Sequence, residues 1–327
     1  MITVALLFRE KRPNGFSIEE IFKTIERELA QQVVFKKFYV NKSKSKFWNI
    51  KAVAKIKADV YHITGDCNYL ALGIPPEKTI LTVHDIGHYE NTLSGLKKWL
   101  YGLFWFKWPL QKAKHITCIS NFTKSKLIEY FKIDATKINV IYNPYPALFK
   151  ANLKTFRTKT PIILQIGAGH NKNTARLIEA IKGLDCKLLL INGLNENIEK
   201  QLKQNQISYI SKSKLSFDEV YEAYCFADIV FFASTYEGFG LPIVEANATG
   251  RVIVTSTVAS MPEIAGDSAY LVNPLSVDEI RTALQNIIEN ADLRSQLIKN
   301  GFENIKRFES YEIANQYFQL YCKVAQK

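Results

Sequence analysis

Short apolar runs rich in β-branched and aromatic residues alternate with longer amphipathic segments along the whole chain. The short runs are typical of buried strands, and the amphipathic segments have helical length and period. Such alternation predicts an α/β fold of parallel sheets with helices on both faces, in which ligands bind at the carboxyl ends of strands. The predicted strands are Ile2–Phe8, Val33–Val40, Val60–Ile63, Thr79–Val83, His115–Ile119, Ile138–Ile141, Ile162–Ile166, Lys187–Ile191, Ser208–Ile210, Ile229–Phe232, Val252–Val254 and Tyr270–Val272. Predicted helices include Ile18–Ala30, Thr123–Phe131, Thr174–Ile181, Phe217–Phe226 and Val277–Ile288.

Two domains are expected, because 327 residues exceed the roughly 250–300 at which a single hydrophobic core stops growing. The boundary should fall in Asn143–Thr160, a segment with prolines and little periodicity. We therefore expect a first domain over residues 1–150 and a second over residues 151–308. A last helix, Tyr311–Val324, lies within residues 309–327, has no strand after it and would cross back onto the first domain.

Composition narrows the class of protein. Hydrophobic residues make up 47% and charged residues 23%, which excludes disordered and collagen-like chains. The five cysteines have no metal-ligand spacing, so neither a disulfide framework nor a zinc site is predicted. The first apolar run is too short for a signal peptide, and no stretch reaches the roughly 18–20 apolar residues of a membrane span. These observations predict a cytoplasmic protein.

The net charge of +12 lies entirely in the first half. Residues 1–150 hold 24 Lys and Arg but only 12 Asp and Glu, whereas the rest of the chain is balanced. This asymmetry suggests that the two domains face different partners. A nucleic-acid-binding protein is one reading of the charge, but no helix-turn-helix, zinc or RNA-recognition motif accompanies it.

The most informative stretch is Ala227–Pro242, ADIVFFASTYEGFGLP. A buried strand leads into a loop with two glycines, and a helix then begins with Pro242 in its first turn, where the missing N–H does no harm. A helix N-terminus of this kind binds phosphate. Glu237 in the loop and Glu245 in the helix can face one ligand, and carboxylates beside an anion site are best explained as acceptors for sugar or ribose hydroxyls.

A second stretch, Ile162–Ile181, repeats the pattern of strand, glycine turn and helix N-terminus. The strand ends at Gly167, and Lys172 adds a mobile cation beside the turn. This arrangement also predicts a phosphate site.

The seven-residue separation of Glu237 and Glu245 resembles the E-x7-E motif of retaining glycosyltransferases of the GT-B family four (GT4). The surrounding EGFGLPIVEANATG and the later SMPEIAGDSAYLVNP are similar to the same family, and the resemblance extends over Thr79–Pro274. It implies two Rossmann-like doubly wound domains with a cleft between them. It also implies that the first Glu contacts hydroxyls of a donor sugar and the second binds the ribose. The implied donor-binding residues are Gly15, Gly167, Lys172, Ile210, Glu237, Gly238, Phe239, Gly240, Leu241 and Glu245, with His84, Lys172 and Glu237 as catalytic residues.

Within this resemblance Lys172 would neutralise the leaving diphosphate. Ala168 stands where the family often has an arginine, so Lys172 would carry more of this role, helped by Arg251 or by a cation of the first domain. Ile210 would offer backbone contacts to the base, although Ser-Lys-Ser replaces the usual glycine after its strand.

The first domain contributes weaker candidates. His84 would reach the donor sugar with a hydrogen bond near the reacting centre, and Asp85 would orient His84 or hold the acceptor. Gly15 and Phe16 match the loop that the family brings near the donor phosphate and the acceptor.

The segment Leu96–Lys114, LKKWLYGLFWFKWPLQKAK, combines tryptophans with flanking lysines. Interfacial membrane helices have this composition. A buried helix of the first domain, or one that lines an acceptor groove, explains Trp99–Trp108 equally well.

The resemblance thus predicts a retaining, metal-independent hexosyltransferase without a cofactor. Its donor would be a UDP- or GDP-sugar, and its acceptor a lipid-linked or surface-polysaccharide glycan such as lipopolysaccharide. The anionic inner face of the cytoplasmic membrane is a candidate location, and no nucleic-acid partner is expected. The alternatives are another GT-B activity, such as sugar-nucleotide epimerisation, and a basic nucleic-acid-binding protein.

Overall fold

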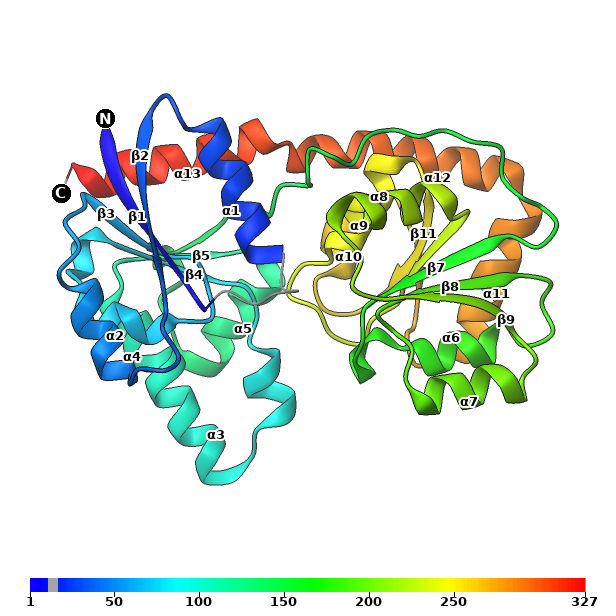
Figure 1. Cartoon of the computed structure of the whole chain (residues 1–327), viewed down its shortest axis with the longest axis horizontal. Coiled ribbons are helices and arrows are strands. Elements are labelled where there is room, and N and C mark those ends of the chain that lie inside the picture. The colour runs from blue at the N-terminus through cyan, green and yellow to red at the C-terminus, as the bar shows by residue number, and fades with distance from the viewer. Residues whose placement is uncertain (11–16, 327) are drawn as a thin grey trace. The chain divides into compact units, whose positions relative to one another are not determined.

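The computed structural model describes residues 1–10 and 17–326 and divides into two compact units. Unit 1 consists of Met1–Pro144 together with Glu309–Lys327, and unit 2 of Tyr145–Phe308. Each unit contains its own six-stranded sheet with helices packed against it (Figure 1).

The sheet of unit 1 is parallel throughout, with the strand order β2-β1-β3-β4-β5-β6. Its strands are β1 (Ile2–Phe8), β2 (Val33–Tyr39), β3 (Val60–Ile63), β4 (Thr79–Val83), β5 (His115–Cys118) and β6 (Ile138–Val140). Its α-helices are α1 (Ser17–Glu28), α2 (Lys46–Val53), α3 (Gly95–Tyr101), α4 (Trp108–Lys112), α5 (Asn121–Phe131) and α13 (Ser310–Ala325). Short 3₁₀ segments span Asn68–Gly73, Pro76–Lys78 and Ala135–Lys137, and π-helical turns span His88–Thr92 and Gly102–Lys107.

The predicted C-terminal helix is confirmed as α13, which packs against α1 within unit 1. Its side chains Tyr317 and Tyr321 are buried. The hydroxyl of Tyr321 lies 2.8 Å from Nδ1 of His62 on β3, and Thr82 Oγ1 lies 2.7 Å from Nε2 of the same ring. Burial lowers the pKa of His62 to about 3, so the ring is neutral and both of its nitrogens are satisfied by hydroxyls.

The sheet of unit 2 is also parallel, with the order β12-β11-β10-β7-β8-β9. Its strands are β7 (Ile162–Ile166), β8 (Lys187–Ile191), β9 (Ser208–Lys212), β10 (Ile229–Phe232), β11 (Val252–Ser256) and β12 (Tyr270–Val272). Its helices are α6 (Thr174–Ala180), α7 (Glu196–Gln204), α8 (Phe217–Phe226), α9 (Leu241–Thr249), α10 (Met261–Ala265), α11 (Val277–Glu289) and α12 (Ala291–Asn304), with 3₁₀ turns at His170–Lys172 and Ile305–Phe308. Apolar side chains of the strands pack against α6 and α11 in one core that includes Leu177, Leu188, Phe231 and Leu284.

Both sheets reverse their winding at the first strand of the unit. β1 lies between β2 and β3, and β7 lies between β8 and β10, so consecutive crossovers lead to opposite sides of these strands. This is the doubly wound α/β topology, and the predicted fold class is confirmed. Ligands of such sheets bind at the carboxyl edge where the winding reverses. The loops after β1, β3, β7 and β10 are therefore the places to search for a site.

The apolar patterning predicts the strands well, since every predicted strand is present and differs by at most two residues at either end. In the described part of the chain, no helix has the length and apolarity needed to cross a membrane.

Candidate functional site

Two loops of unit 2 meet at the carboxyl edge of its sheet, because β7 and β10 are hydrogen-bonded neighbours. Lys172, after β7, places its Nζ 2.6 Å from Oε1 of Glu237, after β10. Nδ2 of Asn171 donates to the same oxygen at 3.2 Å. The structure thus brings together the lysine and the first glutamate that the sequence predicts to act on one ligand.

The turn before Lys172 requires glycine. Gly167 has a φ of +99°, a region that side-chain-bearing residues rarely adopt. A Cβ at this position would lie 3.0 Å from Cε of Lys172, so the lysine side chain crosses directly over the glycine. The ammonium also lies 5.0 Å from the ring centroid of Phe232, a cation–π contact. Lys172 and Glu237 remain 20% and 18% exposed, which leaves both accessible to a ligand.

The loop after β10 is fixed by side chains that follow other strands. Asn173 Nδ2 donates to the carbonyls of Ala233 (3.0 Å) and Pro274 (2.6 Å). Oγ of Ser260 lies within hydrogen-bonding distance of the carbonyls of Glu237 and Phe239, at 2.9 and 2.7 Å. These contacts hold Glu237 in place and set the start of α9.

The predicted glycine loop and helix start are where the sequence places them. Gly238, Phe239 and Gly240 form the loop, and α9 begins at Leu241 with Pro242 in its first turn. Phe239 is buried, so its side chain anchors the loop.

Glu245 is buried in α9, and its Oε2 accepts a hydrogen bond of 2.5 Å from the hydroxyl of Tyr224 on α8. Burial raises the pKa of Glu245 to about 7, although the Tyr224 hydrogen bond and the charge of Lys172 both act to lower it. Burial likewise raises the pKa of Tyr224 well above its ordinary value, so the phenol stays protonated and donates. Glu245 lies in the helix that begins directly after the loop that carries Glu237.

Arg251 does not assist Lys172, contrary to the expectation from the sequence. It is buried, and its guanidinium donates to the carbonyls of Tyr224, Thr249, Gly250, Asn152 and Cys225. All of its donor directions are used to join α8, α9 and the chain near Asn152, which makes it a structural residue.

Ile210 lies inside β9 and pairs with Leu189 of β8, because the strand continues to Lys212 instead of ending at Ile210 as predicted. Its half-buried side chain lines a cavity of about 540 Å³ together with Leu189 and Phe226. Contact with a base at this position remains a prediction.

In unit 1, His84 follows β4, and its Nε2 lies 2.7 Å from the carbonyl oxygen of Thr64. A carbonyl only accepts, so Nε2 carries the proton and Nδ1 is the ring nitrogen with a lone pair. Burial lowers the pKa of His84 and favours this neutral form. Gly65, with a φ of +134°, is required because a Cβ there would lie 2.5 Å from Cδ2 of His84.

The structure gives less support to the other candidates of the first domain. Asp85 is exposed, and its Oδ1 accepts from the backbone N–H of Gly87 at 2.7 Å, so the hydrogen bond that orients the His84 ring comes from Thr64. Gly15 and Phe16 lie outside the described residues. Within the described ranges, no cluster of three or more His, Cys, Asp or Glu side chains could hold a metal ion.

Sequence reasoning did not single out Tyr224, Asn171 or Ser260. Asn171 could have been found as the neighbour of Lys172 in the loop after β7. Nothing in the sequence indicates that Tyr224 bonds Glu245, because their contact depends on how α8 packs against α9.

Two doubly wound units, with acidic and basic residues gathered where the sheet of unit 2 reverses its winding, define an α/β protein with a candidate ligand site at that edge. Comparison with known families makes this specific. The family profile "Glycosyl transferases group 1" matches residues 150–304, and "Glycosyltransferase Family 4" matches residues 12–147. The chain belongs to the GT4-type glycosyltransferases.

Individual relatives agree with this assignment. The chain is 27% identical over 239 residues to the O-antigen chain mannosyltransferase RfbU of Salmonella typhimurium (strain LT2), a match that covers 69% of this chain and 67% of RfbU. The matched regions of three curated relatives, RfbU among them, span 60 to 70% of their lengths.

Solved structures share the fold. Sucrose-phosphate synthase from Thermosynechococcus elongatus has a TM-score of 0.82 at 18% identity, covering 99% of both chains. Anabaena Alr3699/HepE in complex with UDP-glucose has a TM-score of 0.77 at 13% identity, covering 97% of this chain and 98% of that one.

Proposed function

We propose that the chain is a retaining glycosyltransferase that moves a mannosyl or related hexosyl group from a UDP- or GDP-sugar to a lipid-linked or surface-polysaccharide acceptor. The observation that carries the proposal is the contact of Lys172 with Glu237, in the loop that leads into the helix of the buried Glu245. The mannosyltransferase name of RfbU supports mannose as the sugar, and the UDP-glucose complex of HepE supports a nucleotide-sugar donor.

Lys172, Glu237 and Glu245 each fit one part of such a donor. The Lys172 ammonium would contact the diphosphate, where negative charge grows as the glycosidic bond to phosphate breaks. A charge that interacts more strongly with the transition state than with the ground state accelerates the reaction. Glu237, relieved of its ion pair with Lys172, would accept hydrogen bonds from sugar hydroxyls. Glu245, held by Tyr224, would bind the ribose hydroxyls.

Retention of configuration would follow from a front-face displacement. The bond from the anomeric carbon to the phosphate oxygen breaks, the acceptor oxygen bonds to that carbon on the same face, and the acceptor proton passes to the leaving diphosphate. No protein nucleophile is required. Lys172 would stabilise the leaving group without a metal ion, and Nδ1 of His84 would accept a hydrogen bond from the donor sugar.

The segment with the tryptophans has two faces. Phe106 and Leu110 are buried in the core of unit 1, whereas Leu96, Trp99, Phe104 and Trp108 are exposed, with Trp99 61% exposed. Core packing therefore explains half of the segment. We extend the proposal to the other half, which would lie against an anionic lipid surface where the acceptor is anchored, because the excess positive charge is in the same half of the chain.

The first test is a donor screen by thermal shift with UDP- and GDP-hexoses, since a ligand at 100 times its Kd stabilises by about 2.7 kcal/mol. Glu245→Ala should weaken nucleotide-sugar binding, and Glu237→Ala should lower turnover. Glu303→Ala is the matched control, because it breaks an ion pair of the same 2.6 Å length with Lys306 on the exposed surface. Unchanged kinetics in both site variants would refute the site assignment.

Further measurements separate the finer points. Product anomers identified by NMR test retention, and activity in a chelator tests independence from metal. Sugar-nucleotide product formed without any acceptor would indicate an epimerase. Co-sedimentation with anionic but not zwitterionic vesicles tests the lipid surface, and binding to DNA instead would favour the nucleic-acid alternative.

A further inference from the structure

A cavity at the carboxyl edge of the unit 1 sheet lies where that sheet reverses its winding. It has a volume of about 510 Å³, and it is lined by residues that follow β1 (Arg9, Glu10), β2 (Lys42, Lys44) and β3 (Asp66). This volume is in the range of small-ligand sites, and the position is where doubly wound sheets bind ligands.

One wall of this pocket carries excess positive charge. The sequence NKSKSK places Lys42 and Lys44 in the loop after β2 and Lys46 at the first position of α2, so the three lysines alternate with other residues. Lys42 is paired with Glu10 at 3.0 Å. Lys44 and Lys46 form no ion pair with a carboxylate of the described residues.

Hydrogen bonds fix the backbone conformation of the segment that carries these lysines. Backbone N–H of Asn41 donates to Oδ1 of Asn49 (2.9 Å), and Nδ2 of Asn49 donates back to the carbonyl of Asn41 (3.0 Å). Asn49 is buried on α2, and Ser45 caps this helix by accepting from the N–H of Trp48. The lysines therefore extend from a fixed backbone.

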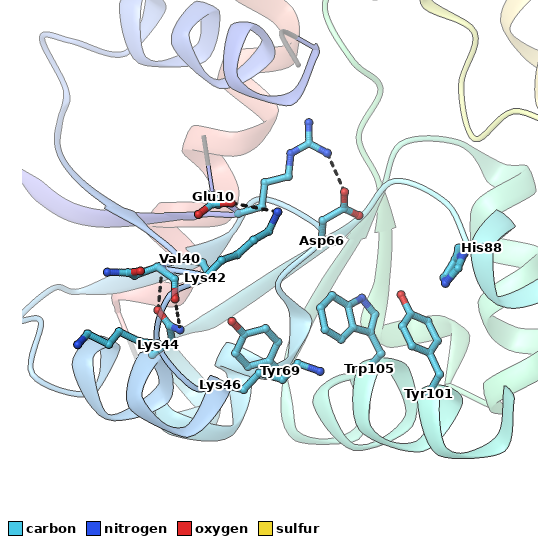
Figure 2. A pocket seen from close by; sticks show the side chains of 13 residues that line it. Glu10, Val40, Lys42, Lys44, Lys46, Asp66, Tyr69, His88, Tyr101 and Trp105 are labelled. Carbon is cyan, nitrogen blue, oxygen red and sulfur yellow. Dashed lines mark hydrogen bonds and ion pairs between the residues drawn. The ribbon is translucent and has the colours of Figure 1, made fainter. Parts of the chain in front are cut away.

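The opposite wall is aromatic. Tyr101 and Trp105 are stacked with ring centroids 5.4 Å apart, and the ring centroids of Tyr69 and Trp105 are also 5.4 Å apart. The phenol oxygens and the indole nitrogen point from the helices toward the pocket (Figure 2). The Nζ of Lys46 lies 5.1 Å from the Trp105 ring centroid, so the cationic and aromatic walls meet.

A smaller cavity continues from this pocket to His84 and Asp85. It shares Asp66, Tyr101 and Trp105 with the pocket. The lysines lie at the far end from His88, which borders both cavities (Figure 2). A ligand that begins at His84 and extends through both cavities would therefore reach Lys44 and Lys46.

We propose that this pocket binds an anionic saccharide, with the sugar against Tyr69, Tyr101 and Trp105 and with its phosphate or carboxylate at Lys44 and Lys46. Aromatic side chains with polar tips suit a sugar, because they combine apolar surface with partners for hydroxyl groups. Two cations that pair with no carboxylate in the described part of the chain suit an anion, and charge-assisted hydrogen bonds are the stronger kind. Resting on the proposed function, the inference specifies the acceptor as an anionic glycan whose reacting hydroxyl faces His84.

The test is calorimetric titration of the full chain with four probes: mannose 6-phosphate, glucuronate, methyl α-mannoside and inorganic phosphate. Lys44→Ala/Lys46→Ala should weaken the charged saccharides roughly tenfold, an effect of about 1.4 kcal/mol, and should leave methyl α-mannoside unchanged. The control Lys55→Ala/Lys57→Ala removes the same charge from exposed lysines outside the pocket and should change no affinity. Whichever of mannose 6-phosphate and glucuronate binds more tightly identifies the anion.

Trp105→Ala should weaken all three saccharides but not inorganic phosphate, and Trp105→Phe should restore part of the affinity. Equal affinity for charged and neutral saccharides, or equal effects of the two lysine pairs, would overturn the inference. Donor binding is measured separately by thermal shift. Suppose that nucleotide-sugars bind, that transfer occurs, and that Lys44→Ala/Lys46→Ala leaves the acceptor KM unchanged. The inference about this pocket is then wrong, while the proposed function stands. If no nucleotide-sugar binds, the proposed function fails, while probe titrations that behave as expected still support the saccharide site.

Discussion

Glu245 is the site residue whose environment makes the sharpest prediction. Its carboxyl is buried, and its pKa is raised from 4.5 to about 7. Because the folded-state pKa is higher than the unfolded one, the folded state binds more protons between these pH values. The free energy of unfolding therefore falls as the pH rises from about 4.5 to 7 and is constant above that window.

The size of the effect follows from the shift. One pKa unit corresponds to 1.36 kcal/mol, so ionising Glu245 should cost about 3 kcal/mol of stability. Glu245→Gln keeps an oxygen that can accept from the Tyr224 hydroxyl and removes the charge. The variant should therefore gain about 3 kcal/mol relative to the native chain between pH 4.5 and pH 8. Glu289→Gln, at an exposed position on α11, is the control and should show no such gain.

Denaturant unfolding followed by two signals isolates the relevant unit. All four tryptophans, Trp48, Trp99, Trp105 and Trp108, belong to unit 1. Far-UV circular dichroism reports both units, so the transition that tryptophan fluorescence does not follow is that of unit 2. A difference between native chain and Glu245→Gln that is the same at pH 4.5 and pH 8 would refute the reasoning.

Two further predictions concern single contacts. Gly167→Ala should lower nucleotide-sugar affinity, because the added Cβ would displace the Lys172 side chain. Gly183→Ala is the control, since Gly183 also has a positive φ (+73°) but a Cβ there would have no atom within 4 Å. Both variants should lose about 1–3 kcal/mol to backbone strain in denaturant unfolding, and equal donor affinities, measured by thermal shift, would contradict the role of the glycine. Tyr321→Phe leaves Nδ1 of His62 buried without its 2.8 Å partner, so the fluorescence-detected unfolding of unit 1 should lose about 1–3 kcal/mol. An unchanged midpoint would show that the helix α13 is not held by this bond.

The sequence predicts the strands because their β-branched and aromatic runs are short and bounded by polar residues. The errors lie at strand ends, where local pattern is weakest. β9 continues through Ser211 to Lys212 because these residues pair with Leu190 and Ile191 of β8, a tertiary constraint that polar side chains do not reveal. The expected role of Arg251 beside Lys172 is wrong for a similar reason, since only the folded chain shows that backbone carbonyls surround its guanidinium.

The segment Leu96–Lys114 shows a different limit. Its composition is equally compatible with a core helix and an interfacial one, and the structure buries some of its side chains and exposes others. Phe106 is buried while Trp99 is exposed on the same stretch of chain. A run that is apolar on all sides carries no periodic signal to separate the two faces, and only the packing of Gly102–Lys107 as π-helical turns against the core decides which side chains point inward.

At the candidate site, the sequence predicts which residues act but does not predict which of them are in contact. Lys172 and Glu237 are 65 residues apart, and the sequence indicates each of them because it lies in a glycine-containing loop between a buried strand and a helix. What the sequence does not contain is the order of the strands, and their contact exists because β10 adds beside β7 on the side away from β8. The same reversal at β1 brings the lysines after β2 and Asp66 after β3 to one pocket. In the sequence, Lys44 and Lys46 are indistinguishable from the other residues that make up the net charge of +12. Only the strand order shows that their loop shares the carboxyl edge of the sheet with the loops after β1 and β3. Motifs after strands thus identify the chemistry, and the strand order decides which of them act together.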